Sequence, residues 1–175
     1  MEDKSSYEYV SFNDNEYTND IYYKYPCVGN PLTRDNRGRT ACHIAAASNE
    51  LHLVHPTWYH DPTLQDDIGW TVAMTSANYG SINKLDPRWN HDIYLRDNMG
   101  QTVAMIAASA DYIHTLPHYW YHARTLGDNN GMTVAMLAAG GDTLEVMSKH
   151  WKHSPTLRDK EGRTVAMIAA CYPSI

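Results

Sequence analysis

Histidines come closest, in type and spacing, to the residues of a reactive site. His60, His91, His122 and His153 recur at intervals of 31 residues, and imidazole is a common zinc ligand. Zinc needs all its ligands within about 2.0–2.3 Å of one point. Equivalent residues of adjacent repeat units should instead lie about 10 Å apart, the distance between packed helices. We therefore predict no metal here, and expect each histidine to bond the last carbonyls of a helix.

Three further histidines have the four-residue spacing of a zinc-binding helix: His114, His118 and His122. Pro117 interrupts that helix, and no acidic residue has the accompanying position. Two pairs are of the same weak kind, His52 with His55 and His150 with His153. A histidine-based metal-binding protein stays open as an alternative function.

Patterns typical of catalysis are missing from the sequence. It has no glycine-rich phosphate loop and no nucleophile elbow. Cys42 and His43 are adjacent, so they would point to different faces of a helix. The aspartates recur in every copy of a repeat, as scaffold residues do. We expect no enzyme activity, no catalytic residue and no cofactor.

A repeat of 31 residues positions all these side chains. Each copy contains an aspartate, a glycine three residues later and a threonine two residues after the glycine. The glycines are Gly38, Gly69, Gly100, Gly131 and Gly162, and the threonines are Thr40, Thr71, Thr102, Thr133 and Thr164. The units, numbered 1 to 5 below, are 31–61, 62–92, 93–123, 124–154 and the half-unit 155–175.

Each unit is predicted to contain two helices. The Asp-x-x-Gly segment is a tight turn, and the threonine after it is the N-cap of a short helix rich in alanine. Asn49, Gly80, Asp111 and Asp142 share one position, where a left-handed conformation should end this helix. A longer second helix follows, with buried pairs three residues apart: Leu51/Val54, Ile82/Leu85, Ile113/Leu116 and Leu144/Met147.

The segment Asp-Asn-Arg-Gly-Arg-Thr-Ala-Cys-His-Ile-Ala-Ala, residues 35–46, closely resembles the ankyrin repeat. The resemblance covers 31–175 and implies an all-α solenoid of helix-turn-helix units. Three departures are plain. Methionine replaces the usual histidine in every unit except at His43, the proline after the threonine is absent, and the period is 31 residues instead of about 33.

Four tryptophans share the column that is normally leucine in the ankyrin family: Trp58, Trp89, Trp120 and Trp151. Large rings in this column should fill the core between units. The alternative is a ladder of aromatic binding sites.

Ankyrin-like domains bind partners through the turn tips and the exposed face of the first helix. Carried over by register, these positions hold an apolar patch with flanking arginines. The apolar residues are Ile68, Trp70, Tyr79, Met99 and Met132, and the arginines are Arg34, Arg37, Arg39, Arg96 and Arg163. Such patches are typical of protein interfaces. The alternative for Trp70 is that it folds onto its own repeat or packs against Tyr94.

The resemblance implies a protein-protein interaction module whose partner is another protein. A stand-alone inhibitor that occludes its target, such as a host defence factor, is the favoured form, and an intracellular scaffold or adaptor is the alternative. The net charge is −6, but residues 31–175 are nearly neutral, with fourteen acids and twelve bases. Nucleic-acid binding is not expected, because it needs clustered Lys and Arg.

Three cysteines, Cys27, Cys42 and Cys171, have no metal-motif spacing and indicate a reducing compartment. No secretory signal and no membrane-spanning run is recognisable. We expect a cytoplasmic protein without membrane contact, in the host cytoplasm if it is viral or an effector.

The two ends depart from the repeat. Residues 1–30 hold six tyrosines and six acids and are predicted to be a divergent cap, helical near 3–11 and 15–25. The alternative is a partner-binding or phosphorylated segment. The half-unit ends at Ile175, soon after its first helix. It is either a cap or a contact for oligomerisation.

Overall fold

The computed structural model describes residues 30–54, 61–89, 91–120, 124–141, 143–147 and 153–172. The regular secondary structure of these residues is all-helical, with five α helices of seven residues and no strand. The helices are α2 (Ala41–Ala47), α3 (Val72–Asn78), α4 (Val103–Ser109), α5 (Val134–Gly140) and α6 (Val165–Cys171). The expected cap in 1–30 lies outside the described residues, apart from Asn30.

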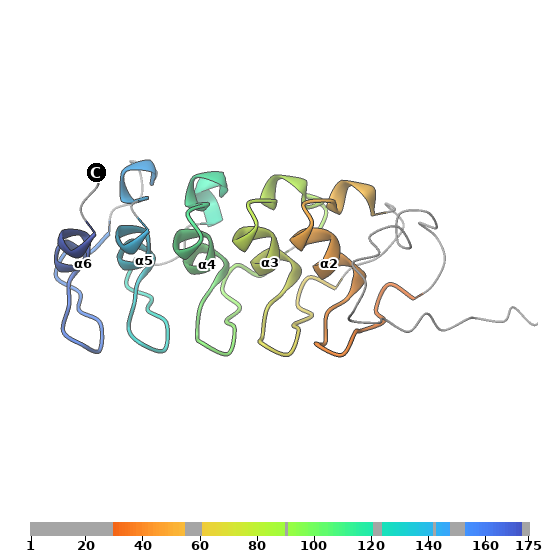
Figure 1. Ribbon diagram of the computed structural model, residues 1–175, viewed down its shortest axis with the longest axis horizontal. Coiled ribbons are helices and arrows are strands. Elements are labelled where there is room, and N and C mark those ends of the chain that lie inside the picture. The colour runs from red at the N-terminus through yellow and green to blue at the C-terminus, as the bar shows by residue number, and fades with distance from the viewer. Residues whose placement is uncertain are drawn as a thin grey trace, which may run out of the picture.

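The five helices stand in a single row, in chain order (Figure 1). Each contacts the next one along, α2 with α3, α3 with α4, α4 with α5 and α5 with α6. The loops that precede the helices all project on one side of the row, and short 3-10 turns lie on the other (Figure 1). Nothing in the described part of the chain is a helix long and apolar enough to cross a membrane.

The helices begin and end where the repeat predicts. Each starts after its threonine, an N-cap in extended conformation. The Oγ1 atom of Thr71 accepts a hydrogen bond from the backbone N–H of Met74 at 3.3 Å. At the other end, Asn49, Gly80 and Asp111 have φ of 59°, 68° and 64°, which confirms the left-handed position. Its fourth member, Asp142, lies outside the described residues.

The prediction of a longer second helix in each unit is wrong for the part of the chain that the structure describes. Its place is taken by single 3-10 turns: η1 (Leu51–Leu53), η2 (Ile82–Lys84), η3 (Ile113–Thr115) and η5 (Leu144–Val146), with η4 (His118–Trp120) directly after η3. Extended residues end η2 and η3, at Leu85 and Leu116. Pro117 explains the ending at Leu116, since proline disfavours helix in the residue before it; Leu85 is followed by Asp86, so Pro87 does not act on it in this way.

Small side chains let neighbouring helices approach closely. Ala73, Ala77, Ala104 and Ala108 are buried between units, together with methionines at the position after the first alanine. The expected apolar stripe is present in part: Leu51, Ile82, Ile113, Leu116 and Met147 are buried, whereas Val54, Leu85 and Leu144 are only partly buried. Trp89 and Trp120 are partly buried, and their rings pack against these buried apolar side chains. Trp58 and Trp151 lie outside the described residues.

Each loop ends in a tip closed by its aspartate; the tips are 35–38, 66–69, 97–100, 128–131 and 159–162. In unit 3, Oδ1 of Asp97 accepts hydrogen bonds from the backbone N–H of Met99 at 2.9 Å and of Gln101 at 2.7 Å. The equivalent two bonds are present in all five tips. The tip glycines have φ between 71° and 84°, a region that side chains disfavour.

Successive tips are also bonded to one another. The backbone N–H of Asn98 donates to the carbonyl of Ile68 at 3.1 Å, and that of Asn129 donates to the carbonyl of Met99 at 2.9 Å. Matching bonds join units 1 and 2 and units 4 and 5. The tips therefore form a continuous hydrogen-bonded edge along one side of the row.

The double bond to each aspartate predicts a large and specific loss on mutation. Asp97→Ala should lower the free energy of unfolding by about 2–4 kcal/mol, because it leaves two tip N–H groups and the indole N–H of Trp70 without their acceptor. Asp97→Asn retains an oxygen acceptor and should lose less. Urea denaturation followed by circular dichroism measures both. The control is Asp67→Ala, which removes an exposed carboxylate from the neighbouring tip and should be nearly neutral; a similar loss there would contradict this explanation.

Candidate functional site

One residue in each tip has an exposed side chain and a hydrogen-bonded backbone N–H. We call these five residues the apex row: Arg37, Ile68, Met99, Asn130 and Glu161. Each apex N–H donates to the tip aspartate of its own unit, at 2.8–3.1 Å. The carbonyls of the first four each accept the N–H of a residue in the next tip, at 2.8–3.1 Å. The backbone is therefore fixed at positions where the side chains differ.

The middle of the apex row is apolar and open to solvent. The exposed fraction is 54% for Ile68 and 58% for Met99, and these residues occupy equivalent places in neighbouring units. Arg37 precedes them, also exposed, and its side chain makes no hydrogen bond or ion pair with the described residues. A cation and two apolar groups therefore occupy neighbouring tips, and none of these three side chains stabilises the described part of the chain through a hydrogen bond, an ion pair or burial in the core.

Two of the arginines predicted to contact a partner hold neighbouring loops together by hydrogen bonds. Nη1 of Arg34 donates to the carbonyl of Gly38 at 2.7 Å and to that of Gln65, in the next unit, at 2.6 Å. Arg96 makes the same pair of bonds, to Gly100 and Gly127, each at 2.8 Å. These side chains tie one loop to the next, and sequence reasoning missed this role because the 31-residue row also contains glutamine and glycine.

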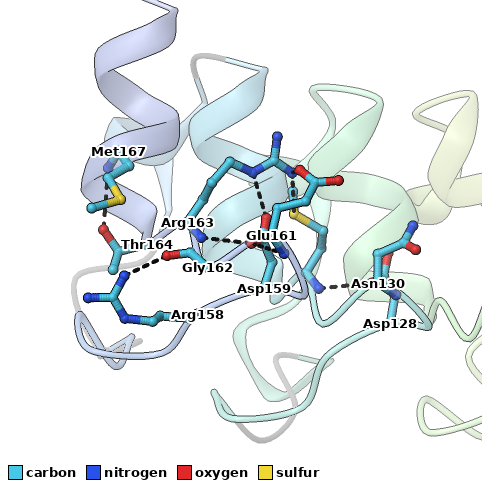
Figure 2. A network of polar contacts seen from close by, with 10 residues as sticks. Asp128, Asn130, Arg158, Asp159, Glu161, Gly162, Arg163, Thr164 and Met167 are labelled. Atoms are coloured by element: carbon cyan, nitrogen blue, oxygen red, sulfur yellow. Dashed lines mark hydrogen bonds and ion pairs between the residues drawn. The ribbon is translucent and has the colours of Figure 1, made fainter.

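Arg39 and Arg163 belong to a second structural row, directly after the tip glycine. Nε of Arg39 donates to Oδ2 of Asp35 at 2.7 Å, and Arg163 binds Asp159 at the same distance. Burial would raise the pKa of Asp35, but the hydrogen bonds from Arg39 and Arg37 outweigh it and lower that pKa. The pKa of Asp159 is lowered in the same way, chiefly by Arg163. Figure 2 shows Arg163 also reaching Glu161.

Trp70 stands in the same row and is also engaged within the chain. Its Nε1 donates to Oδ2 of Asp97 at 3.0 Å, and its ring is partly buried against the core residues around α3, α4 and α5. The tryptophan therefore supports the following tip. Met132 is likewise partly buried, against α5 and α6 residues. Tyr79 is 50% exposed, at the end of α3.

His43 is a buried part of the scaffold. Its Nδ1 accepts from the backbone N–H of Thr40 at 3.2 Å, so its Nε2 carries the proton and donates to the carbonyl of Trp70 at 3.0 Å. In unit 2, Met74 has the equivalent place, and its sulfur accepts the N–H of Thr71 at 3.4 Å. The methionine thus replaces the histidine as a weak acceptor at the helix start, but without the bond to the next unit.

The predicted capping role of the histidine column is wrong at His91. No helix ends there, because residues 85–89 form a bend and a turn after η2. The His91 ring instead lies between Trp89 and Trp120, with ring centroids 6.0 and 5.9 Å away. Burial lowers the pKa of His91 to about 4. His60 and His122 lie outside the described residues.

No group of three or more histidine, cysteine or acidic side chains that could hold a metal ion occurs among the residues that the structure describes. Cys42 and Cys171 are both free thiols, the first buried and the second exposed. Burial raises the pKa of the Cys42 thiol to about 12, so this residue is an unreactive core side chain.

No protein-family model and no curated protein matches the chain.

His91 should make the stability depend on pH. Its pKa is about 4 in the folded chain and about 6.5 when unfolded, so the unfolded state binds the proton more tightly. The contribution is complete above pH 6.5 and is lost as the pH falls towards 4, by on the order of 2–3 kcal/mol. Urea denaturation at several pH values should show this slope in wild type. His91→Leu should show a shallower slope; an equal slope would exclude His91 as its origin.

Trp70→Phe tests the structural role of the indole. It removes the hydrogen bond to Asp97 but retains most of the apolar ring, so the free energy of unfolding should fall by about 1 kcal/mol. Thermal and urea melts provide the measurement. Adding Trp70→Phe to Asp97→Asn should cost less than the sum of the single changes; full additivity would show that the bond does not stabilise the tips.

Proposed function

We propose that this chain is an ankyrin-type repeat solenoid that binds another protein through its tips. The proposal depends on one observation: Ile68 and Met99 are more than half exposed at neighbouring tips whose backbone is fixed on both sides. Apolar side chains do not stabilise the fold there, and exposed apolar groups with flanking charges are typical of interfaces. The 31-residue spacing of the five helices supports the solenoid part of the proposal.

The fixed backbone favours tight binding. Association normally costs free energy because loops and side chains must be ordered. In the apex row, the tip aspartate holds each residue and the next tip also holds the first four, so binding at Ile68 and Met99 would restrict only the side chains. Met99 adds adaptability, since its flexible thioether can fit surfaces of different shape.

The chemistry along the apex row describes the partner. Its order is a cation, two apolar groups, an amide and a carboxylate, at Arg37, Ile68, Met99, Asn130 and Glu161. Glu161 is already paired with Arg163 at 2.6 Å. The partner should therefore present an apolar surface to Ile68 and Met99, with an acidic group towards Arg37.

We favour an inhibitor over an adaptor, because one contiguous apolar surface suits the occlusion of one target. An adaptor would hold two proteins at once, and only the adaptor should be recovered in a ternary complex. Cytoplasmic location belongs to the same proposal, since neither Cys42 nor Cys171 is in a disulfide.

Affinity capture with matched variants tests the proposed surface. Wild type and Ile68→Ser/Met99→Ser serve as bait in extracts of the source cells or of a candidate host. A true partner should be lost from the double variant by at least about tenfold, as expected when central apolar contacts are removed. The melting curve should not change, because both side chains are exposed.

The control is Leu53→Ser/Val146→Ser, which removes exposed apolar side chains from the 3-10 turns on the other side of the row (Figure 1). This variant and Trp70→Phe should retain the partner. A partner held equally by all the variants would move the site away from the tips, and one lost only with Trp70→Phe would make Trp70 the contact.

A further inference from the structure

One row of side chains joins each loop to the next, and this row is interrupted in unit 4. We call it the bridging row; its members directly precede the tips and are Arg34, Gln65, Arg96, Gly127 and Arg158. In units 1 to 3, one side-chain nitrogen donates to two carbonyls, at 2.5–2.8 Å. The first carbonyl belongs to the tip glycine of the same unit, and the second to the bridging-row residue of the next unit. Gly127 has no side chain with which to make this bridge.

The two carbonyls that a bridge from unit 4 would join are those of Gly131 and Arg158. Neither accepts a hydrogen bond from a residue that the structure describes. A side-chain carbon placed on Gly127 would lie 3.0 Å from the carbonyl oxygen of Gly131, so the open position is beside this acceptor. In unit 2 the two equivalent carbonyls meet at one nitrogen, Nε2 of Gln65. Units 4 and 5 therefore offer a pair of acceptors to one N–H donor.

The rest of the bridging row indicates which donor fits. The neighbours of Gly127 in the row are both arginines, Arg96 and Arg158. Figure 2 shows Arg158 turned to its own tip, where Nη1 donates to the carbonyl of Gly162. A third cation between these two would be repelled by both. Gln65 also lies between two arginines of the row, and it bridges with a neutral amide whose NH2 group has two hydrogens, one for each carbonyl.

The acceptor pair is accessible and lies beside the apex row. Gly131 directly follows Asn130, the apex residue of unit 4. Gly131 is half-buried and Arg158 is exposed, so a group from outside the chain can approach. Direct bonds to both carbonyls would replace the bonds that these acceptors make with water, at little cost.

We propose that the carbonyls of Gly131 and Arg158 bind the carboxamide side chain of an asparagine or glutamine in the partner protein. The inference rests on the proposed function, because the amide comes from a protein held at the tips. Its nitrogen donates one hydrogen bond to each carbonyl, so the bound partner completes the bridging row in unit 4. The amide adds a polar contact to the apolar contacts of Ile68 and Met99.

The same pair of acceptors rejects a carboxylate. An aspartate or glutamate in the partner has nearly the shape of the amide, but it would place oxygens against two carbonyl oxygens with no proton between them. The site therefore discriminates by repulsion as well as by attraction.

A melting experiment tests the acceptor pair without a partner. Gly127→Gln supplies the amide from the chain itself, as Gln65 does in unit 2. Gly127→Met is the matched control, because it has a similar length and the same crowding against Gly131 but no N–H donor. The melting temperature of Gly127→Gln should exceed that of Gly127→Met by about 2–5 °C. Equal melting temperatures would overturn the inference.

Affinity capture separates this inference from the proposed function. Gly127→Gln should hold the partner at least about tenfold more weakly than wild type, because its own amide occupies both carbonyls. Gly127→Ala leaves the carbonyls open and should hold the partner as wild type does. A partner lost with Ile68→Ser/Met99→Ser but held fully by Gly127→Gln would overturn the inference and leave the proposed function standing. The opposite pattern would support the amide site and contradict the apex row.

A double-mutant cycle with the captured partner identifies the amide. Each asparagine and glutamine on the partner's surface is replaced by alanine in turn. One replacement should weaken binding to wild type by about tenfold and should have much less effect on binding to Gly127→Gln. Replacing that residue by the corresponding acid should weaken binding to wild type further. If every replacement affects wild type and Gly127→Gln equally, no partner amide binds these carbonyls and the inference is wrong.

Discussion

The pair of hydrogen bonds accepted by each tip aspartate is the interaction on which the other features depend. One carboxylate oxygen holds the backbone N–H groups two and four residues later, in all five units. That geometry brings the chain back to the threonine that starts the helix. It also aligns each tip with the next one, so the inter-tip bonds and the packing of neighbouring helices follow from it.

Main chain and side chains have separate tasks at the tips. The rows on either side of the apex, which include Arg34, Trp70 and Arg96, bond to carbonyls or carboxylates of their own and the next unit. The apex side chains of Ile68 and Met99 are instead more than half exposed. A residue type common in binding sites, such as tryptophan or arginine, is therefore a poor guide here, because the same groups also serve as hydrogen-bond donors between units.

Much of the fold could be predicted from the sequence. The 31-residue period determined the five helix starts at threonine and the left-handed residues Asn49, Gly80 and Asp111, since these depend on local backbone chemistry. The second helix could not be predicted well, because an apolar pair three residues apart fits one 3-10 turn as well as a helix. The hydrogen bonds of Trp70 and the ring environment of His91 join different units, so spacing within one unit could not reveal them.

The fixed backbone of the apex row has an evolutionary consequence. A substitution at Ile68 or Met99 changes the surface chemistry without removing a core contact or a backbone hydrogen bond. Most substitutions elsewhere in a unit disturb an alanine interface, a tip or a helix start, and selection for folding removes them. The apex positions can therefore accumulate variation at little cost in stability, and under the proposed function a lineage could exchange one target for another while keeping the same scaffold.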